Sequence, residues 1–394
     1  MSFKFQLAKI DPNTCTIEEL DNEILRLKSI KEEYFNLEQS IKIFINSIYG
    51  ACASPYFVGY NINVAEAVTL QGQDLIKYAN KVLDEWFMNV WHKDTELHKE
   101  LGLTYVNPIQ EKSVIVYNDT DSTYVTFSPL LKSCDAPTDR NAIIDFILKI
   151  KELRLNKYLS EKFKQYAEAY NTVDIQNLEL EKISYRALML AKKKYILDIG
   201  WKDPGVRYEP QKKVTPTGVE IVQGSTPKFV RKTLKELLDI LLAKGKDIEY
   251  GEIVKKLKTY KEQFLLQDPD DISKTMSIGD YEKYVLEDRK TVSLANKCPI
   301  NVRAAALYNN AVLGTKWKSK YNLIKTGDKI KFYYSKGEHE VFGFLPGDFP
   351  YEFAPSVDYD AQFERTVVEP FNRFIEPLGF NPIPGNLIYS KALF

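Results

Sequence analysis

Cysteine and histidine are scarce in this sequence, and neither is spaced as a metal centre would need. Four cysteines lie far apart along the chain: Cys15, Cys52, Cys134 and Cys298. The three histidines are as scattered: His92, His98 and His339. A zinc site needs clustered thiol or imidazole ligands, so these spacings argue against one. We expect reduced thiols and a cytoplasmic location.

Long apolar runs and a net charge are also missing. No run is long enough to span a bilayer, and Met1-Ser2-Phe3-Lys4 does not begin a signal peptide, so we expect no membrane partner. Lysine and arginine together number 54, as do aspartate and glutamate. This neutrality argues weakly against nucleic-acid binding. Residues 182–213 are nevertheless rich in lysine and arginine, and a neutral protein can carry a charged local face.

Hydrophobic periodicity predicts an α+β fold rather than alternating βαβ units. Thr16 and Glu19 have the spacing of a capping box before a long helix that reaches about Ile48. Thr226 and Pro227 have the order of an N-cap and a first helical residue. The helix that follows is predicted to carry one apolar face: Val230, Leu234, Leu237, Leu238 and Leu241. Other helices are predicted over 63–91, 143–169 and 299–313. Strands are predicted over 114–117, 123–127, 178–197 (two strands), 329–334 and 340–344.

One face of the first predicted helix carries Lys42, Asn46 and Tyr49, at steps of four and three, just before Gly50. An ammonium, an amide and a phenol together suit a nucleotide. The alternative is a solvated helix face that ends in a glycine cap. Three isoleucines of the same helix are expected to point inward: Ile41, Ile45 and Ile48.

Asp119 and Asp121 lie between two predicted strands, at the tip of a hairpin. Residues two apart on an extended backbone point to the same side, so the two carboxylates would form a compact anionic site. Mg²⁺ prefers a few carboxylates together with phosphate oxygens and water. The alternative is an ordinary turn, because Asn, Asp, Thr and Ser are usual turn residues.

A third group combines acidic and basic side chains on the strands predicted over 178–197. Glu179 and Glu181 would share one strand face. Lys193 and Tyr195 would share another face, opposite Lys192 and Lys194. Clustered lysines beside a carboxylate site suit a phosphate backbone, whereas lysines on an exposed strand edge also prevent aggregation.

The three groups occur in an order that resembles family B DNA polymerases. They read Lys42-x-x-x-Asn46-Ser47-x-Tyr49-Gly50, Tyr117-x-Asp119-Thr120-Asp121-Ser122, and Glu179-x-Glu181 followed by Lys192-Lys193-Lys194-Tyr195. Four later segments are similar to the phage branch of that family: 218–220, 225–228, 297–303 and 374–378. The resemblance runs from about Glu33 to Phe394.

The resemblance implies template-directed DNA synthesis by nucleotidyl transfer, with two Mg²⁺ ions as cofactors and primer–template DNA and a dNTP as partners. Asp121 would be a metal ligand with Asp119 beside it, and Glu181 would be an accessory carboxylate. Lys42 would contact the triphosphate, Asn46 would support the sugar side, and Tyr49 with Gly50 would line the nascent base pair. Lys193 and Tyr195 would hold the primer terminus, with Lys192 and Lys194 on the DNA backbone.

The sequence departs from the family because it lacks the upstream block Asp-x-x-Ser-Leu-Tyr-Pro-Ser, which carries the first catalytic aspartate. The exonuclease carboxylates and the first fingers helix are also absent. We expect a naturally split polymerase whose N-terminal half is a second chain; a truncated fragment is the alternative. A non-catalytic duplex DNA-binding module is the alternative function.

The resemblance divides the chain into the end of the fingers (1–52), the palm (53–223) and an α-rich thumb with a tail (224–394). In the palm, Asp121 and Glu181 are expected on adjacent strands of one sheet. The prolines Pro382 and Pro384 precede a tail that ends in Leu393 and Phe394. By resemblance, those two residues dock on a sliding clamp; a tail that packs on the thumb or frays is the alternative. If a phage encodes the chain, the location is the host cytoplasm.

Overall fold

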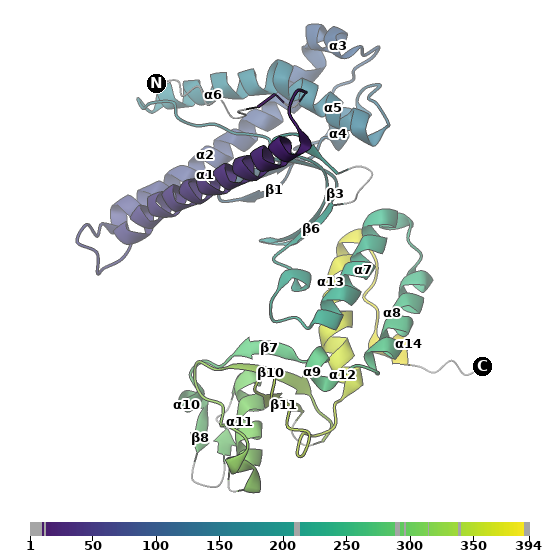
Figure 1. The fold of residues 1–394 in the computed structure, drawn as a ribbon. Coiled ribbons are helices and arrows are strands. Elements are labelled where there is room, and N and C mark those ends of the chain that lie inside the picture. Colours follow the sequence, from purple (N-terminus) through teal and green to yellow (C-terminus); the bar gives the residue numbers. More distant parts are fainter. Residues whose placement is uncertain are drawn as a thin grey trace. The chain divides into compact units, whose positions relative to one another are not determined.

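The computed structural model describes residues 10–11, 13–208, 213–287, 292–294, 297–313, 315–337 and 340–389. Helices and antiparallel strands are mixed, which confirms the predicted α+β class (Figure 1). The chain forms two compact units, Met1–Lys93 with Pro108–Leu130, and Asp94–Asn107 with Leu131–Phe394. These units do not follow the boundaries after residues 52 and 223, and the division into fingers, palm and thumb stays a prediction. Within the described residues, no helix is long and apolar enough to cross a membrane.

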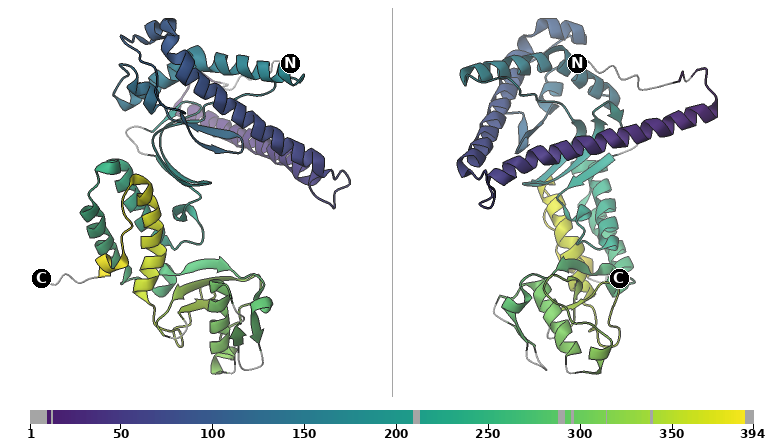
Figure 2. Two further views of the ribbon diagram at one scale, coloured as in Figure 1. Left: turned by 180° about the vertical axis from the view of Figure 1, so that it is seen from behind. Right: turned by 60° about the vertical axis from the view of Figure 1, so that its left-hand side comes forward.

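The first unit begins with two long helices, α1 (Ile17–Cys52) and α2 (Ile62–Glu85), which meet at their connecting loop and diverge away from it (Figure 2). The predicted capping box at the start of α1 is confirmed. The Glu19 amide donates to Thr16 Oγ1 at 3.3 Å, and the Thr16 amide donates to Glu19 Oε2 at 2.9 Å. Asn61 caps α2 by accepting from the amides of Asn63 and Val64.

The packed part of this unit is the far end of α2, where a π-helical turn (Trp86–Val90) and a 3-10 turn (Trp91–Lys93) continue the helix. Trp86, Phe87 and Trp91 are fully buried there. The predicted hairpin follows as β1 (Ile115–Asp119) and β2 (Ser122–Val125), which form an antiparallel two-stranded sheet. After it comes the short helix α4 (Ser128–Lys132).

The second unit begins with α3 (Thr95–Leu101), α5 (Arg140–Ile150) and α6 (Asn156–Ala169), the last two joined by a π-helical turn. Arg154 of that turn donates to Asp94 at 2.8 Å and to Glu100 at 3.1 Å, and so joins it to both ends of α3. A four-stranded antiparallel sheet follows, with β4 paired to β3 on one edge and to β5 and β6 on the other. Its strands are β3 (Lys182–Ala191), β4 (Lys194–Lys202), β5 (Val206–Arg207) and β6 (Lys213–Thr217).

The rest of the second unit has one continuous core of helices around small sheets. Its helices are α7 (Lys228–Lys244), α8 (Tyr250–Phe264), α9 (Pro269–Ile272), α10 (Tyr281–Tyr284), α11 (Ile300–Val312), α12 (Tyr359–Phe363), α13 (Glu369–Ile375) and α14 (Gly385–Tyr389). Its strands are β7 (Lys274–Ser277), β8 (Val285–Glu287), β9 (Val292–Leu294), β10 (Lys329–Tyr334) and β11 (Val341–Phe344). The predicted pair β10–β11 is confirmed, and β7 adds a third strand that periodicity did not predict.

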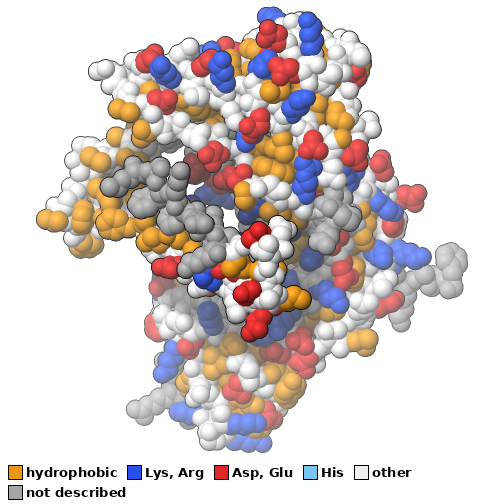
Figure 3. Space-filling model, turned by 45° about the horizontal axis from the view of Figure 1, so that its top comes forward, with side chains coloured by type: hydrophobic (Ala, Val, Ile, Leu, Met, Phe, Trp, Pro, Cys, Tyr) orange, Lys and Arg blue, Asp and Glu red, His pale blue; other side chains and the backbone are white. Residues whose placement is uncertain are grey.

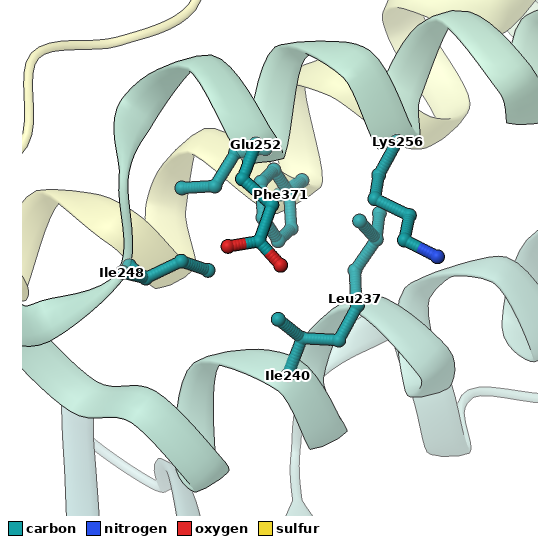
Figure 4. Close-up of a pocket in the computed structure, with 7 residues that line it drawn as sticks. Leu237, Ile240, Ile248, Glu252, Lys256 and Phe371 are labelled. Carbon is teal, nitrogen blue, oxygen red and sulfur yellow. The ribbon is translucent and has the colours of Figure 1, made fainter.

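Helix α7 shows both a confirmed and a wrong expectation. Its apolar face packs into the core as predicted: Val230, Leu234, Leu237, Leu238 and Leu241. The N-cap is Pro227 rather than Thr226, because the helix begins one residue later at Lys228. A narrow hollow between α7, α8 and α13 has mainly aliphatic and aromatic walls (Figure 4). Glu252 lies beside it and already accepts from Lys244 at 2.6 Å, so the hollow offers no free carboxylate.

Lys261 of α8 is a charged group inside this core. Its ammonium contacts Asp360 Oδ1 at 2.6 Å, donates to the Tyr359 carbonyl at 2.7 Å, and lies 5.2 Å from the centre of the Phe363 ring. Burial lowers the pKa of Lys261 below its ordinary 10.5, although the neighbouring Asp360 opposes that shift. The ion pair therefore costs desolvation energy as well as contributing attraction.

We predict that Lys261→Met alters how stability depends on pH. Between the lowered pKa and 10.5 the folded wild type binds fewer protons at this group than the unfolded chain does, so its free energy of unfolding rises with pH. In urea unfolding at successive pH values, the free energy of unfolding of wild type should increase relative to that of Lys261→Met as the pH approaches 10.5. Lys256→Met, an exposed lysine of the same helix, is the control. Parallel curves for wild type and Lys261→Met would contradict this account.

Candidate active site

Asp119 and Asp121 lie at the tip of the β1–β2 hairpin, as predicted, but not on one extended strand. Asp119 pairs with Ser122, so Thr120 and Asp121 form the turn between the strands. Thr120 adopts a positive φ of 54°, and the Asp121 amide donates to the Asp119 carbonyl at 2.7 Å. The expectation that an extended backbone aligns the carboxylates is wrong, because the chain reverses between them. Asp119 is half-buried at the strand end, and Asp121 is exposed in the turn.

The hairpin is held against one face of α2 by polar side chains. Asp84 Oδ1 accepts from the Val114 amide at 2.8 Å and from Ser113 Oγ at 3.1 Å. One turn earlier, Asn80 Oδ1 accepts from Thr123 Oγ1 at 2.5 Å. These contacts fix the strands that enter and leave the aspartate turn. Sequence reasoning missed Asn80 and Asp84, and the available signal was two polar residues four apart beside apolar positions of α2.

Aromatic contacts complete the attachment of the hairpin. Phe87, one turn beyond Asp84, packs edge-on against Phe127 with ring centres 5.1 Å apart. Across the strands, the rings of Tyr117 and Tyr124 lie 5.4 Å apart. The turn therefore projects from a supported base, although Thr120 and Asp121 are themselves exposed.

The stripe of Lys42, Asn46 and Tyr49 lies on the last third of α1, and all three side chains are exposed. An added Cβ at Gly50 would meet no atom within 4 Å. The expectation that three isoleucines point inward is wrong: exposed fractions are 51% for Ile41, 59% for Ile45 and 49% for Ile48. Of α1, which is described throughout, Glu23 alone is buried, so this helix has apolar residues that the described part of the chain leaves partly or fully exposed.

The lysine cluster forms a turn rather than two strand faces. Ala191 pairs with Lys194, so Lys192 and Lys193 connect β3 to β4, and Lys193 has a positive φ of 61°. The predicted sharing of a strand face by Lys193 and Tyr195 is therefore wrong, because a turn separates them from β3. Tyr195 lies on β4 and pairs with Thr217 of β6.

Gly218 lies directly under this lysine turn. It follows β6 with a positive φ of 66°, and an added Cβ would lie 2.1 Å from the Lys193 carbonyl oxygen. The close approach explains a glycine at the start of Gly218-Val219-Glu220, since any side chain would push the turn away.

Glu179 and Glu181 are not on a strand, because β3 begins at Lys182. They line a groove of about 610 Å³ with Lys151 and Asp203 beside α6. The expectation that Asp121 and Glu181 occupy adjacent strands of one sheet is wrong. In the described residues β1 and β2 pair only with each other, and β3 pairs with β4.

The described residues contain no group of three or more Asp, Glu, His or Cys side chains that could together hold a metal ion. Asp119 and Asp121 provide the hard oxygen donors that Mg²⁺ prefers. The donor type fits, but the number is too small for two ions, which need further carboxylates from elsewhere.

Comparisons with known proteins bear on the same region. Residues 26–135, from α1 through the hairpin, match the family model for DNA polymerase family B. The DNA-directed DNA polymerase of Escherichia phage RB69 is 25% identical over 321 residues, which cover 75% of this chain and 33% of the phage protein. The DNA-directed DNA polymerase of Enterobacteria phage T4 is 25% identical over 284 residues, which cover 69% of this chain and 29% of the T4 protein. The DNA polymerase of Thermococcus sp. (strain 9oN-7) is 23% identical over 363 residues, which cover 90% of this chain and 36% of that protein.

Residues 26–135 therefore match a family B DNA polymerase domain, and the chain has homologues among phage DNA polymerases at 25% identity. The chain spans about a third of the length of the relatives it matches.

We predict that Gly218→Ala destabilises the sheet by about 1–3 kcal/mol, because the residue needs a positive φ and its Cβ would collide with Lys193. Chemical unfolding measures the change. Gly224→Ala is the matched control, since nothing lies within 4 Å of its added Cβ. Equal stability of the two variants would show that the turn tolerates a side chain there.

Proposed function

We propose that this chain is the C-terminal part of a family B DNA polymerase and contributes half of an active site for template-directed DNA synthesis. The observation that carries the proposal is the Asp119-Thr120-Asp121 turn, supported by α2 and contained in the segment that matches the family. A first aspartate, from a part of the polymerase that this chain lacks, would complete the site. In the reaction, a primer 3′-hydroxyl would lose its proton and attack the α-phosphorus of a dNTP. A phosphodiester bond forms, the bond between the α- and β-phosphates breaks, and pyrophosphate leaves.

We assign to the other residues the roles that the resemblance implies, and their exposure supports the assignment. On α1, Lys42 would bind the triphosphate, Asn46 the sugar side, and Tyr49 with Gly50 the new base pair. All are exposed at one end of a rigid helix, where a ligand can reach them. Charge-assisted contacts from a lysine suit a triphosphate.

Basic residues of the β3–β4 turn would contact the DNA. Lys192 and Lys193 occupy the turn itself, where both ammonium groups can follow a phosphate backbone, and Lys194 with Tyr195 begins β4. Glu181 would act as an accessory carboxylate from the groove beside α6. Leu393 and Phe394, the proposed clamp-binding residues, lie outside the described residues.

Two Mg²⁺ ions would neutralise charge on the transferring phosphoryl group when bound. Asp121 and Asp119 would hold them together with carboxylates of the missing part. The chain's own contribution is to orient nucleotide and primer by hydrogen bonds and charge.

A DNA-binding module without chemistry is the alternative function. The lysine turn alone would serve such a module. A DNA-binding module does not account for an anchored aspartate turn together with the polar stripe on α1, so we favour a catalytic function. Whether the missing part is a second gene product or was severed from this chain does not alter the chemistry.

We predict that the isolated chain incorporates no nucleotide on a primed template and becomes active with the N-terminal polymerase half from the same source. Asp121→Ala should abolish that activity, because losing a metal ligand typically costs several kcal/mol of transition-state stabilisation. Primer extension measures both results. Asp174→Ala, an exposed carboxylate in the segment between α6 and β3, is the control. Robust synthesis by the chain alone would contradict the incomplete-site argument.

We predict opposite effects for two lysines in the reconstituted enzyme. Lys42→Ala should raise the KM for dNTP and leave primer–template binding unchanged. Lys193→Ala should weaken primer–template binding with a reduced dependence on salt, because one phosphate contact is lost. Steady-state kinetics and DNA titrations at several salt concentrations separate the two. Similar behaviour of both variants would refute the division of roles.

A further inference from the structure

A small exposed apolar surface lies in the second unit, at the turn between α8 and α9. Leu265 and Leu266 have exposed fractions of 47% and 84%, and Tyr351 has one of 70%. The Tyr351 hydroxyl donates to Asp268 Oδ2 at 3.2 Å, which places the ring beside the turn that holds the leucines. We call Leu265, Leu266, Asp268, Asp271 and Tyr351 the α8–α9 patch. Large apolar side chains grouped on a surface mark an interaction site.

A larger apolar surface belongs to the first unit. Figure 3 shows hydrophobic side chains gathered on the left, where the tip of the α1–α2 hairpin lies. That hairpin falls within the segment that matches family B polymerases, and the described residues do not identify what covers it. The α8–α9 patch lies outside the matched segment, and its charges define the occupant.

The turn that carries the leucines is held by hydrogen bonds. The amides of Leu265 and Leu266 donate back to carbonyl groups of α8 at 3.0 and 3.3 Å. The Tyr359 hydroxyl donates to the Gln267 carbonyl at 3.1 Å, and the Asp268 side chain caps α9. Because this turn is already ordered, a partner that covers the leucines costs little conformational entropy of the chain.

Three aspartates make the patch acidic. Asp268 is the main cause of a raised pKa at Tyr351, above the ordinary 10.0, and Asp270 and Asp271 contribute in the same direction. Asp270 is paired with Lys331 at 2.6 Å. In the part of the chain that the structure describes, no lysine or arginine forms an ion pair with Asp268 or Asp271. Such carboxylates beside an apolar surface attract a cationic partner and repel nucleic acid.

The ring of Tyr351 provides a second attraction for a cation. It contacts the Phe349 ring, with centres 4.6 Å apart and planes at 59°, and is still largely exposed. A guanidinium or ammonium group that lies over the open part of the ring gains a cation–π contact and reaches the carboxylate of Asp268.

We propose that the α8–α9 patch binds a segment of a partner protein in which arginine or lysine lies next to large apolar side chains. The apolar side chains pack on Leu265 and Leu266. The cation lies between the ring of Tyr351 and the carboxylates of Asp268 and Asp271. This binding uses neither the aspartate hairpin nor the lysine turn, so it is a further function beside the proposed DNA synthesis.

The test measures peptide binding to the full chain by isothermal titration calorimetry. The probes are short synthetic peptides in which a leucine pair is followed, at varied spacing, by arginines, and the same peptides with glutamate in place of arginine. Leu266→Ser and Asp271→Lys alter the patch. Ile175→Ser and Asp174→Lys are the matched controls, because Ile175 is 80% exposed and has an exposed carboxylate beside it. Circular dichroism and thermal melting verify that all four variants fold.

We expect wild type and both controls to bind at least one arginine peptide and none of the glutamate peptides. Leu266→Ser and Asp271→Lys should each weaken binding at least about fivefold, as loss of a central contact does. Added salt should weaken the binding of wild type, because exposed charges are screened.

Failure of wild type to bind any arginine peptide would overturn the proposal. So would equal binding of arginine and glutamate peptides, unchanged binding by Leu266→Ser or Asp271→Lys, or equal losses in the control variants. Competition by duplex DNA for the patch, or a dimer of the chain that Leu266→Ser dissociates, would identify a different occupant and refute it too. Primer extension takes no part in these measurements, so the result is independent of the proposed function.

Discussion

The geometry of the candidate site depends on one carboxylate that takes no part in the chemistry. Asp84 of α2 accepts from the amide of Val114 and the hydroxyl of Ser113, just before β1, and so fixes where the hairpin leaves the helix. The aspartate turn lies at the other end of the same short strand. A free two-stranded hairpin is at best marginally stable in water. Asp84, Asn80 and Phe87 therefore convert a weak local element into a rigid support for two charges that repel each other.

The lysine turn, Lys192 and Lys193, is held in place by different contacts from those of the aspartate turn, and it is likewise supported. The lysine turn is constrained by backbone contact, since Lys193 lies against Gly218, and β4 is paired on both edges beneath it. Both motifs place charged side chains on two-residue turns with a residue at positive φ, Thr120 in one and Lys193 in the other. Turns project their side chains beyond the end of the sheet, where phosphates and metal ions are accessible, whereas side chains inside a strand point to the two faces of the sheet.

Predictions from the sequence were confirmed for features that depend on nearby residues. They were wrong where the position or burial of a residue depends on distant parts of the structure. The capping box at Thr16, the apolar face of α7 and the β10–β11 pair depend on nearby residues and were predicted. The aspartate hairpin was also predicted. The location of Lys192 and Lys193 in a turn was not, because the alternation of strand faces was applied to residues that connect β3 to β4. The inward direction assigned to Ile41, Ile45 and Ile48 failed for another reason. An apolar residue indicates burial only if a covering surface exists, and here the described residues leave about half of each of these side chains exposed.

Helix α1 carries the residues that the proposed function assigns to the nucleotide, and the described residues leave them exposed. Its stripe of Lys42, Asn46 and Tyr49 would bind the nucleotide, so the orientation of the helix matters for the chemistry. The faces of a single α-helix keep a fixed orientation relative to one another, because backbone hydrogen bonds restrict the dihedral angles of the helix. A partner that orders α1 thereby places Lys42 and Tyr49 relative to whatever lies opposite them. Any free energy by which the partner favours one orientation of α1 must appear, by thermodynamic linkage, as a difference in nucleotide affinity.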